Sequence, residues 1–139
     1  MSTRRIVVGI DGSQCSRRAL HWALSEAELR NADVDVVHAW EMPVAFGTIP
    51  GEMAYDTTAL EEAARATVDE MVAAAQRSGV RVEKIVTYGP AAATLLEAAK
   101  GADLVVVGSR GRGGFTGLLL GSVGQAVAHH APCPVVIVR

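Results

Sequence analysis

The sequence is poor in aromatic residues, in lysine and in cysteine. Only 4% of its 139 residues are Phe, Trp or Tyr, and lysine occurs only at Lys84 and Lys100. The formal net charge is −2, so the chain lacks the basic excess typical of nucleic-acid-binding domains, and we expect no nucleic-acid partner. Cys15 and Cys133 belong to no Cys-x-x-Cys or Cys/His spacing. We therefore expect two free thiols in a reducing compartment.

Long hydrophobic runs are also missing. Runs such as those at 104–107 and 135–138 fall far short of the ~20 apolar residues that span a bilayer. Near the N-terminus the apolar run before Gly9 consists of Ile6, Val7 and Val8 alone. This run is too short for the core of a signal peptide. These features predict a cytoplasmic protein with no membrane partner.

What the chain does contain is an alternation of short β-branched runs with longer helical periods, within a length that fits one domain over residues 1–139. Strands are predicted at 4–11, 33–40, 80–88, 103–107 and 135–138, and helices at 13–31, 58–78, 90–101 and 121–130. Residues 41–56 show no period and are predicted to form a loop, and Thr58 with Glu61 forms a capping-box pattern. The alternation predicts a three-layer α/β domain with a five-stranded parallel sheet and four helices, a Rossmann-like nucleotide-binding fold.

The segment Gly108-x2-Gly111-x9-Gly121-Ser122 follows the fourth predicted strand and opens a helix. Backbone N–H groups and the positive helix dipole at such a turn suit an anion, and glycines let phosphate oxygens approach the backbone. Arg110 and Arg112 add positive charge. The alternative is structural: Ser122 with Gln125 is also a capping-box pattern, so Ser122 would only cap its helix. No GxxxxGK[ST] loop is present.

A second candidate is Asp11-Gly12-Ser13 at the end of the first strand, where Asp11 or Ser13 is equally suited to capping the first helix. In open α/β sheets, ligands bind beyond the carboxyl ends of the strands where strand order reverses. If the strand order is 3-2-1-4-5, Asp11 faces the glycine segment across that crevice. A carboxylate there suits ribose hydroxyls or a metal ion.

The glycine spacing matches the G-2x-G-9x-G-[S/T] signature of ATP-binding universal stress proteins, and the resemblance extends over nearly the whole chain. It includes the first strand with Asp11, the second strand with His38 and the closing Pro132-x-Pro134-Val-Val segment. The chain is thus similar to that family, whose members bind ATP with Mg²⁺ or Mn²⁺.

The resemblance implies a role for each matching position. Asp11 corresponds to the acid near the ribose and metal, and the Ala39 backbone to the group that meets the adenine. The remaining implied positions lie beside adenine and ribose (Val107, Gly108) or contact the phosphates (Gly111, Gly121, Ser122, Val123). Gly9 stands where some members have proline, which implies a looser wall.

Other residues are weaker candidates. His38 either reaches the edge of the nucleotide or packs within its strand. The alternatives for Trp40 and Phe46 are contact with the adenine ring or a structural role in the core or loop. His129 and His130 point about 100° apart on a helix, so they are a poor metal pair.

These observations favour an adenine-nucleotide-dependent regulator in the stress response rather than a fast catalyst. One alternative is a slow ATP hydrolase or nucleotide-transfer enzyme, and another is a dimeric interaction module that needs no nucleotide. The apolar strand Val135 to Val138 is expected at a sheet edge, where it pairs with a second copy or is covered by the adjacent helix. The resemblance implies the first of these, a homodimer.

Overall fold

Strands and helices alternate along the whole described chain. The computed structural model describes residues 4–42, 57–111 and 120–139. The strands are β1 (Arg5–Gly9), β2 (Asp33–Trp40), β3 (Val82–Tyr88), β4 (Leu104–Gly108) and β5 (Val135–Val138). The helices are α1 (Gln14–Arg30), α2 (Thr57–Ala75), α3 (Ala91–Ala98) and α4 (Ser122–His130). Of the loop predicted at 41–56, all but residues 41 and 42 lies outside the described residues.

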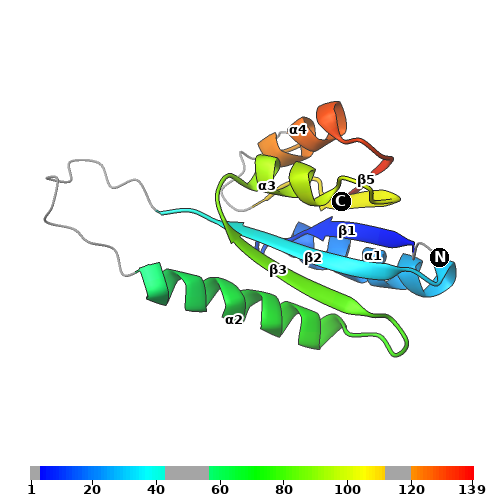
Figure 1. Cartoon of the computed structure of the whole chain (residues 1–139), viewed down its shortest axis with the longest axis horizontal. Coiled ribbons are helices and arrows are strands. Elements are labelled where there is room, and N and C mark those ends of the chain that lie inside the picture. Colours follow the sequence, from blue (N-terminus) through cyan, green and yellow to red (C-terminus); the bar gives the residue numbers. More distant parts are fainter. Residues whose placement is uncertain (1–3, 43–56, 112–119) are drawn as a thin grey trace, which may run out of the picture.

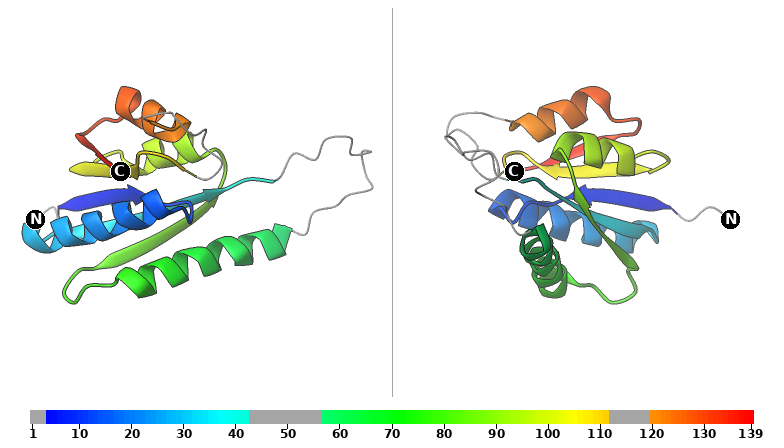
Figure 2. Two further views of the ribbon diagram at one scale, coloured as in Figure 1. Left: turned by 180° about the vertical axis from the view of Figure 1, so that it is seen from behind. Right: turned by 60° about the vertical axis from the view of Figure 1, so that its left-hand side comes forward.

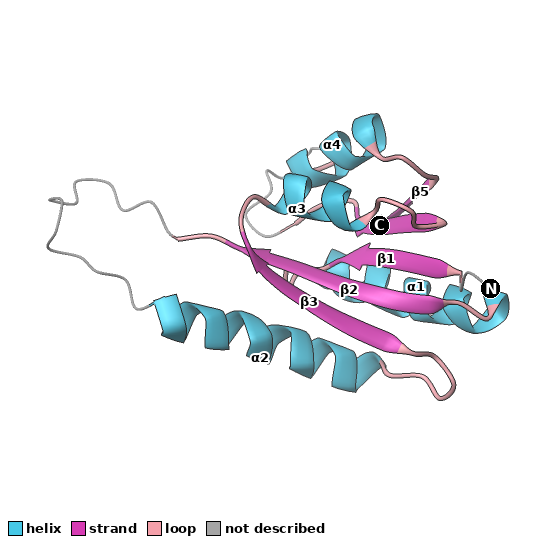
Figure 3. Cartoon of the chain, viewed as in Figure 1, coloured by secondary structure: helices cyan, strands magenta, loops and turns pink. Residues whose placement is uncertain are grey.

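The strands form one parallel sheet in the order β3-β2-β1-β4-β5, which confirms the predicted fold class. Helices α1 and α2 cover one face, and α3 and α4 cover the other (Figures 1 and 3). Seen from behind and from the side, the three layers remain distinct (Figure 2). Because helices cover both faces, the central strands are apolar throughout instead of alternating with polar residues.

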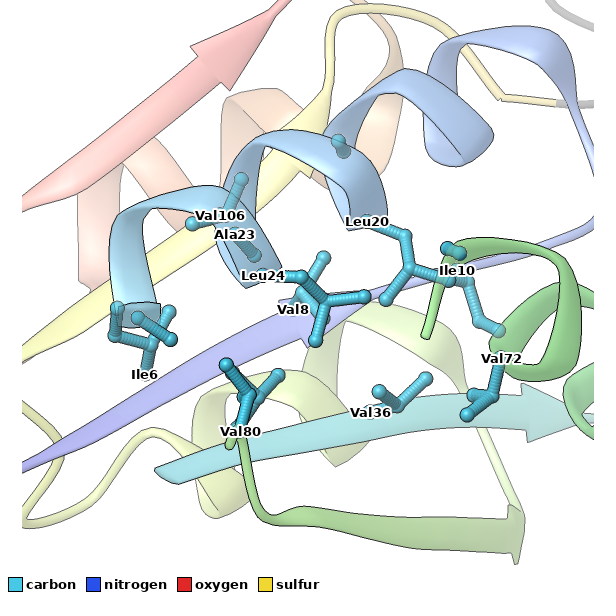
Figure 4. Packing of buried hydrophobic residues seen from close by; sticks show 14 of the residues in the cluster. Ile6, Val8, Ile10, Leu20, Ala23, Leu24, Val36, Val72, Val80 and Val106 are labelled. Atoms are coloured by element: carbon cyan, nitrogen blue, oxygen red, sulfur yellow. The ribbon is translucent and has the colours of Figure 1, made fainter. Parts of the chain in front are cut away.

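The core consists of one hydrophobic cluster on each face of the sheet. Val8 and its neighbours pack under α1 and α2, whereas Val7 faces α3 and α4, because successive strand side chains point to opposite faces. Figure 4 shows Leu24 of α1 beside Val8 of β1. The fully buried Ala19, Leu20, Ala23 and Leu24 recur at the spacing that gives a helix one apolar face.

The two helices that follow β1 and β4 begin differently. Ser13 is the N-cap of α1, and its side chain accepts a hydrogen bond from the Ser16 amide at 3.2 Å, so the capping alternative for Ser13 is confirmed. The N-cap of α4 is Gly121, which has no side chain to cap the helix, and Ser122 is the first helical residue. The Gln125 side chain instead donates to the Leu120 carbonyl at 2.9 Å. The capping-box alternative for Ser122 is therefore wrong.

Helix α2 also differs from its prediction at both ends. The predicted capping box required Thr58 to be the N-cap. The helix already includes Thr57, so Thr58 lies inside it and the prediction is wrong. It ends at Ala75 and not at Ser78, because the chain reverses toward β3 through a turn in which Gly79 has a φ of +85°. Among the helices described, none is both long and apolar enough to cross a bilayer.

The difference between the two helix N-termini can be measured. We expect Ser13→Ala to lower the free energy of unfolding by about 1 kcal/mol, because it removes an observed N-cap hydrogen bond. Ser122→Ala should change it by less than about 0.5 kcal/mol, since no cap is lost at this exposed position. Urea denaturation of both variants provides the comparison. A loss at Ser122 as large as that at Ser13 would contradict the assignment of the caps.

Candidate functional site

The carboxyl ends of β1, β2 and β4 and the first turn of α4 border a cleft of about 530 Å³. This volume lies in the range of small-molecule sites, roughly 300–1,000 Å³. The cleft lies where β1 leads to a helix on one face of the sheet and β4 to a helix on the other (Figure 1). It therefore occupies the switch point at which open α/β sheets bind ligands.

Most of the predicted site residues line this cleft. They are Asp11, Ala39, Val107, Gly108, Arg110, Gly111, Gly121, Ser122 and Val123. Gly12 and Ser13 are not among the lining residues and belong to the turn that starts α1. Arg112 lies outside the described residues. The structure thus brings together the two segments that the sequence analysis placed on opposite sides of the crevice.

Asp11 is held by the turn that connects β1 to α1. Its Oδ1 accepts a hydrogen bond from the Ser13 amide at 2.9 Å, and its own amide donates to Ser16 Oγ at 3.2 Å. The buried Ser16 hydroxyl in turn donates to the Ser13 carbonyl at 3.0 Å. The second carboxylate oxygen lies next to the glycine segment, because a Cβ added at Gly111 would be 2.5 Å from Asp11 Oδ2. Gly111 is therefore required for the carboxylate to stand where it does.

The other two signature glycines have different surroundings. A Cβ at Gly108 would lie 2.8 Å from the Cys15 carbonyl carbon, so glycine here allows β4 to pack against α1. At Gly121 the nearest atom to an added Cβ would be 3.5 Å away, which is ordinary contact. Packing of the protein itself therefore explains Gly108 but not Gly121.

The first turn of α4 presents backbone N–H groups at the cleft. The Gly121 amide donates to the Ser109 carbonyl at 2.6 Å, so this amide is bonded within the protein. Ser122 and Val123 also line the cleft, and helix geometry leaves their amides without an intrahelical acceptor. Together with the helix dipole, these amides favour a negatively charged group.

The electrostatics behind the glycine segment point the same way. Cys15 is buried beneath Gly108, with Arg18 Nη2 3.2 Å from its Sγ. Burial raises the pKa of the Cys15 thiol, but hydrogen bonds from the Ser109 hydroxyl and the Arg110 backbone, with the positive charges of Arg18 and Arg110, outweigh it and leave the pKa below its usual value. The cationic side chains of Arg18 and Arg110 thus lie close enough to the Cys15 thiol, behind the segment, to stabilise its thiolate form.

Part of the cleft's apolar wall and of its polar edge consists of residues that were not predicted from the sequence. These residues are Ile10, Ser16, Val37, Ala91, Leu95, Gly124 and Gln125. Val37 was discoverable, since it lies two residues before Ala39 and shares its side of β2. Leu95 reaches the site through tertiary packing alone: a Cβ at Gly9 would lie 2.7 Å from its Cδ2. Because Leu95 fills this space, the expectation of a looser wall at Gly9 is wrong.

Four of the weaker candidates are described by the structure and are not among the residues that line the cleft: His38, Trp40, His129 and His130. Trp40 packs edge-on against Tyr88, with ring centroids 5.0 Å apart, and Phe46 lies outside the described residues. The rings of His129 and His130 are 6.2 Å apart. In the described ranges, no group of three or more His, Cys, Asp or Glu residues is placed to hold a metal ion. His38 Nδ1 lies 2.9 Å from the Ile10 carbonyl oxygen.

Comparison with known proteins gives consistent matches over the whole chain. A universal stress protein of Mycolicibacterium smegmatis is 43% identical over 136 residues, which cover 96% of this chain and 45% of that protein. The chain therefore spans about half the length of the curated relatives it matches.

Three solved structures share the fold over the full length of this chain. UspA from Lactobacillus plantarum has a TM-score of 0.81 at 23% identity, covering 100% of this chain and 99% of that one. A universal stress protein in complex with cAMP has a TM-score of 0.65 at 30% identity, with coverage of 100% and 98%. The universal stress protein from Archaeoglobus fulgidus in complex with dAMP has a TM-score of 0.73 at 26% identity, with 100% coverage of both chains.

The family model described as "Universal stress protein family" matches residues 2–139. With the sequence relatives and the shared fold, this match shows that the chain belongs to the universal stress protein family.

Proposed function

We propose that the chain binds an adenine nucleotide in the cleft and acts as a nucleotide-dependent regulator in the stress response. The observation that carries the proposal is the position of the Asp11 carboxylate, next to Gly111 in a cleft bordered by the uncapped first turn of α4. Such a cleft offers an acceptor for sugar hydroxyls opposite donors for phosphate oxygens. The neighbours in complex with cAMP and dAMP support an adenine nucleotide as the ligand.

The phosphates belong at the α4 end of the cleft. The amides of Ser122 and Val123 and the exposed Ser122 hydroxyl are donors there, and Gly111 leaves room for close approach to the backbone. Arg110 lines the same end and supplies a positive charge. The contribution of Gly121 is its lack of a side chain, which leaves both the helix end and the neighbouring Gly111 amide uncovered.

The base belongs at the β2 end. In a parallel ladder, alternate residues of a strand bond to opposite neighbours. The Val37 carbonyl accepts from Ile10 on the β1 side, and the Trp40 carbonyl accepts from Gly89 on the β3 side. The backbone of Ala39 therefore faces the β1 side, beyond the point where β1 ends at Gly9. Its N–H and C=O suit the hydrogen-bonding edge of adenine, between apolar surfaces of Val37, Leu95 and Val107.

The ribose then lies between these ends, where Asp11 accepts hydrogen bonds from its hydroxyls and Val107 and Gly108 contact it. For ATP with Mg²⁺ or Mn²⁺, Asp11 is the acidic residue among the described lining residues. Mg²⁺ is commonly held by one or two carboxylates together with substrate phosphates. This residue set fits an ion that arrives with the triphosphate. We further infer that residues 1–139 act as one domain, in the cytoplasm, where Cys15 and Cys133 stay as free thiols.

Binding is tested by titration calorimetry with AMP, cAMP, and ATP with and without Mg²⁺. We expect Asp11→Ala to weaken AMP binding by about 10- to 100-fold, since a hydrogen bond to a charged group contributes about 1.5–3 kcal/mol. Gly111→Ala should have a similar effect because its Cβ displaces the carboxylate. Glu62→Ala, which removes an exposed acid on α2, is the matched control.

The proposal would be contradicted by folded wild-type protein that binds none of the three nucleotides at millimolar concentration. Rapid release of ADP or AMP that depends on Asp11 would favour an enzyme.

We also propose a homodimer formed through β5. This strand pairs with β4 on one side, and in the described part of the chain no strand pairs with its other edge. Its four residues are all apolar and only half-buried, with Val136 and Val138 toward one core cluster and Val135 and Ile137 toward the other. An uncovered apolar edge of this kind favours pairing with a second copy.

Light scattering at micromolar concentration should give the mass of a dimer. We expect Val138→Lys to shift the protein to monomers, because a charge at the end of the strand opposes edge-to-edge pairing. Leu29→Lys is the control, since Leu29 is 81% exposed on α1 and away from this edge. A monomeric wild type would exclude the dimer.

A further inference from the structure

His38 makes a side-chain contact at the end of β1 that neither the cleft lining nor the capping of α1 accounts for. Its Nδ1 lies 2.9 Å from the Ile10 carbonyl oxygen, and its ring is half-buried. A carbonyl oxygen only accepts, so Nδ1 carries the proton and donates. Ile10 stands between Gly9, the last residue of β1, and Asp11. The His38 side chain thus forms a hydrogen bond with the backbone one residue before Asp11.

This side-chain hydrogen bond takes the place of a backbone hydrogen bond between β2 and the chain after β1. The Ile10 amide donates to the Val37 carbonyl at 2.9 Å, so a regular parallel ladder would continue with the Ala39 amide donating to the Ile10 carbonyl. Within the described ranges, no backbone hydrogen bond joins Ala39 to Ile10. The chain leaves the sheet here to form the turn with Asp11, and His38 satisfies the carbonyl that the departure would leave unbonded.

The turn that holds Asp11 is therefore fixed from two sides. From α1, the Ser13 amide binds the carboxylate and Ser16 Oγ accepts from the Asp11 amide. From β2, His38 holds the preceding carbonyl. We propose that His38 is a positioning residue for nucleotide binding, which sets the direction in which the chain leaves β1 and so places the Asp11 carboxylate beside Gly111. This inference rests on the proposed function of the cleft.

The test compares His38→Leu with His38→Asn by calorimetry with AMP. The two side chains have nearly the same shape, but only Asn keeps a donor close to the position of Nδ1. We expect His38→Leu to weaken AMP binding at least tenfold and His38→Asn to stay within threefold of wild type, with both variants folded by thermal denaturation. His130→Leu, exposed at the end of α4, is the control and should bind as wild type.

A double-mutant cycle with Asp11→Ala separates positioning from general loosening of the fold. If His38 acts through Asp11, His38→Leu should cost less than threefold in the Asp11→Ala background, because the carboxylate it places is gone. Equal losses in the two backgrounds, or equal binding by the Leu and Asn variants, would overturn the inference. If the Leu variant does not fold, His38→Asp takes its place, since Asp has the shape of Asn without the donor.

The outcome for the wild type keeps the two proposals apart. Wild-type protein that binds no nucleotide refutes the proposed function of the cleft, and this inference with it. Wild-type protein that binds AMP in an Asp11-dependent way, while His38→Leu binds equally well, refutes the role of His38 alone.

Discussion

The arrangement of the site depends on one juxtaposition, that of the Asp11 carboxylate with Gly111 and the open first turn of α4. It arises because β1 and β4 are neighbours whose following helices lie on opposite faces of the sheet. The chain leaving β1 and the chain leaving β4 thus diverge, and a cleft remains between them. An acid on one border and amides on the other then face the same space. Were β1 and β4 not adjacent, the same residues would be unrelated in space.

The two helices that begin at this cleft differ in how their first N–H groups are satisfied. The start of α1 is satisfied internally: Ser13 caps the helix, and its amide also holds the Asp11 side chain. The start of α4 has a glycine N-cap with no side-chain hydrogen bond, which leaves donors for a ligand. A side-chain cap on α4 would instead satisfy one of these donors within the protein. At α1, therefore, the Ser13 side chain caps the helix while the Ser13 backbone amide orients the Asp11 carboxylate.

Much of this could be predicted from the sequence, for identifiable reasons. Unbroken apolar strands such as β4 require helices on both faces, and that constraint leads to the parallel sheet. The strand order entered the sequence analysis only as a condition, and the structure supplies it. The ranges of β2 and β5 were predicted to the residue, because turn-forming or polar residues bound both runs. The signature spacing likewise located Gly111 and Ser122 at the cleft, although which amides stay available depends on the Gly121–Ser109 hydrogen bond, which no spacing encodes.

What could not be predicted arises from tertiary contacts. Leu95 packs against Gly9, and Gly108 lets β4 pack on Cys15, so these two glycines accommodate different neighbours. To predict the hydrogen bond from His38 to the Ile10 carbonyl, one must know where β1 ends relative to β2. Residue type alone gives none of these distances.

The central claim is that an anion binds at the first turn of α4 opposite Asp11, and amide NMR tests it most directly. In a titration of ¹⁵N-labelled protein with AMP, the amide signals of Ser122, Val123 and Gly111 should show the largest shifts, while those at the C-terminal end of α1 stay in place. Binding that leaves the Ser122 and Val123 signals unmoved, and shifts amides away from the cleft instead, would contradict the claim.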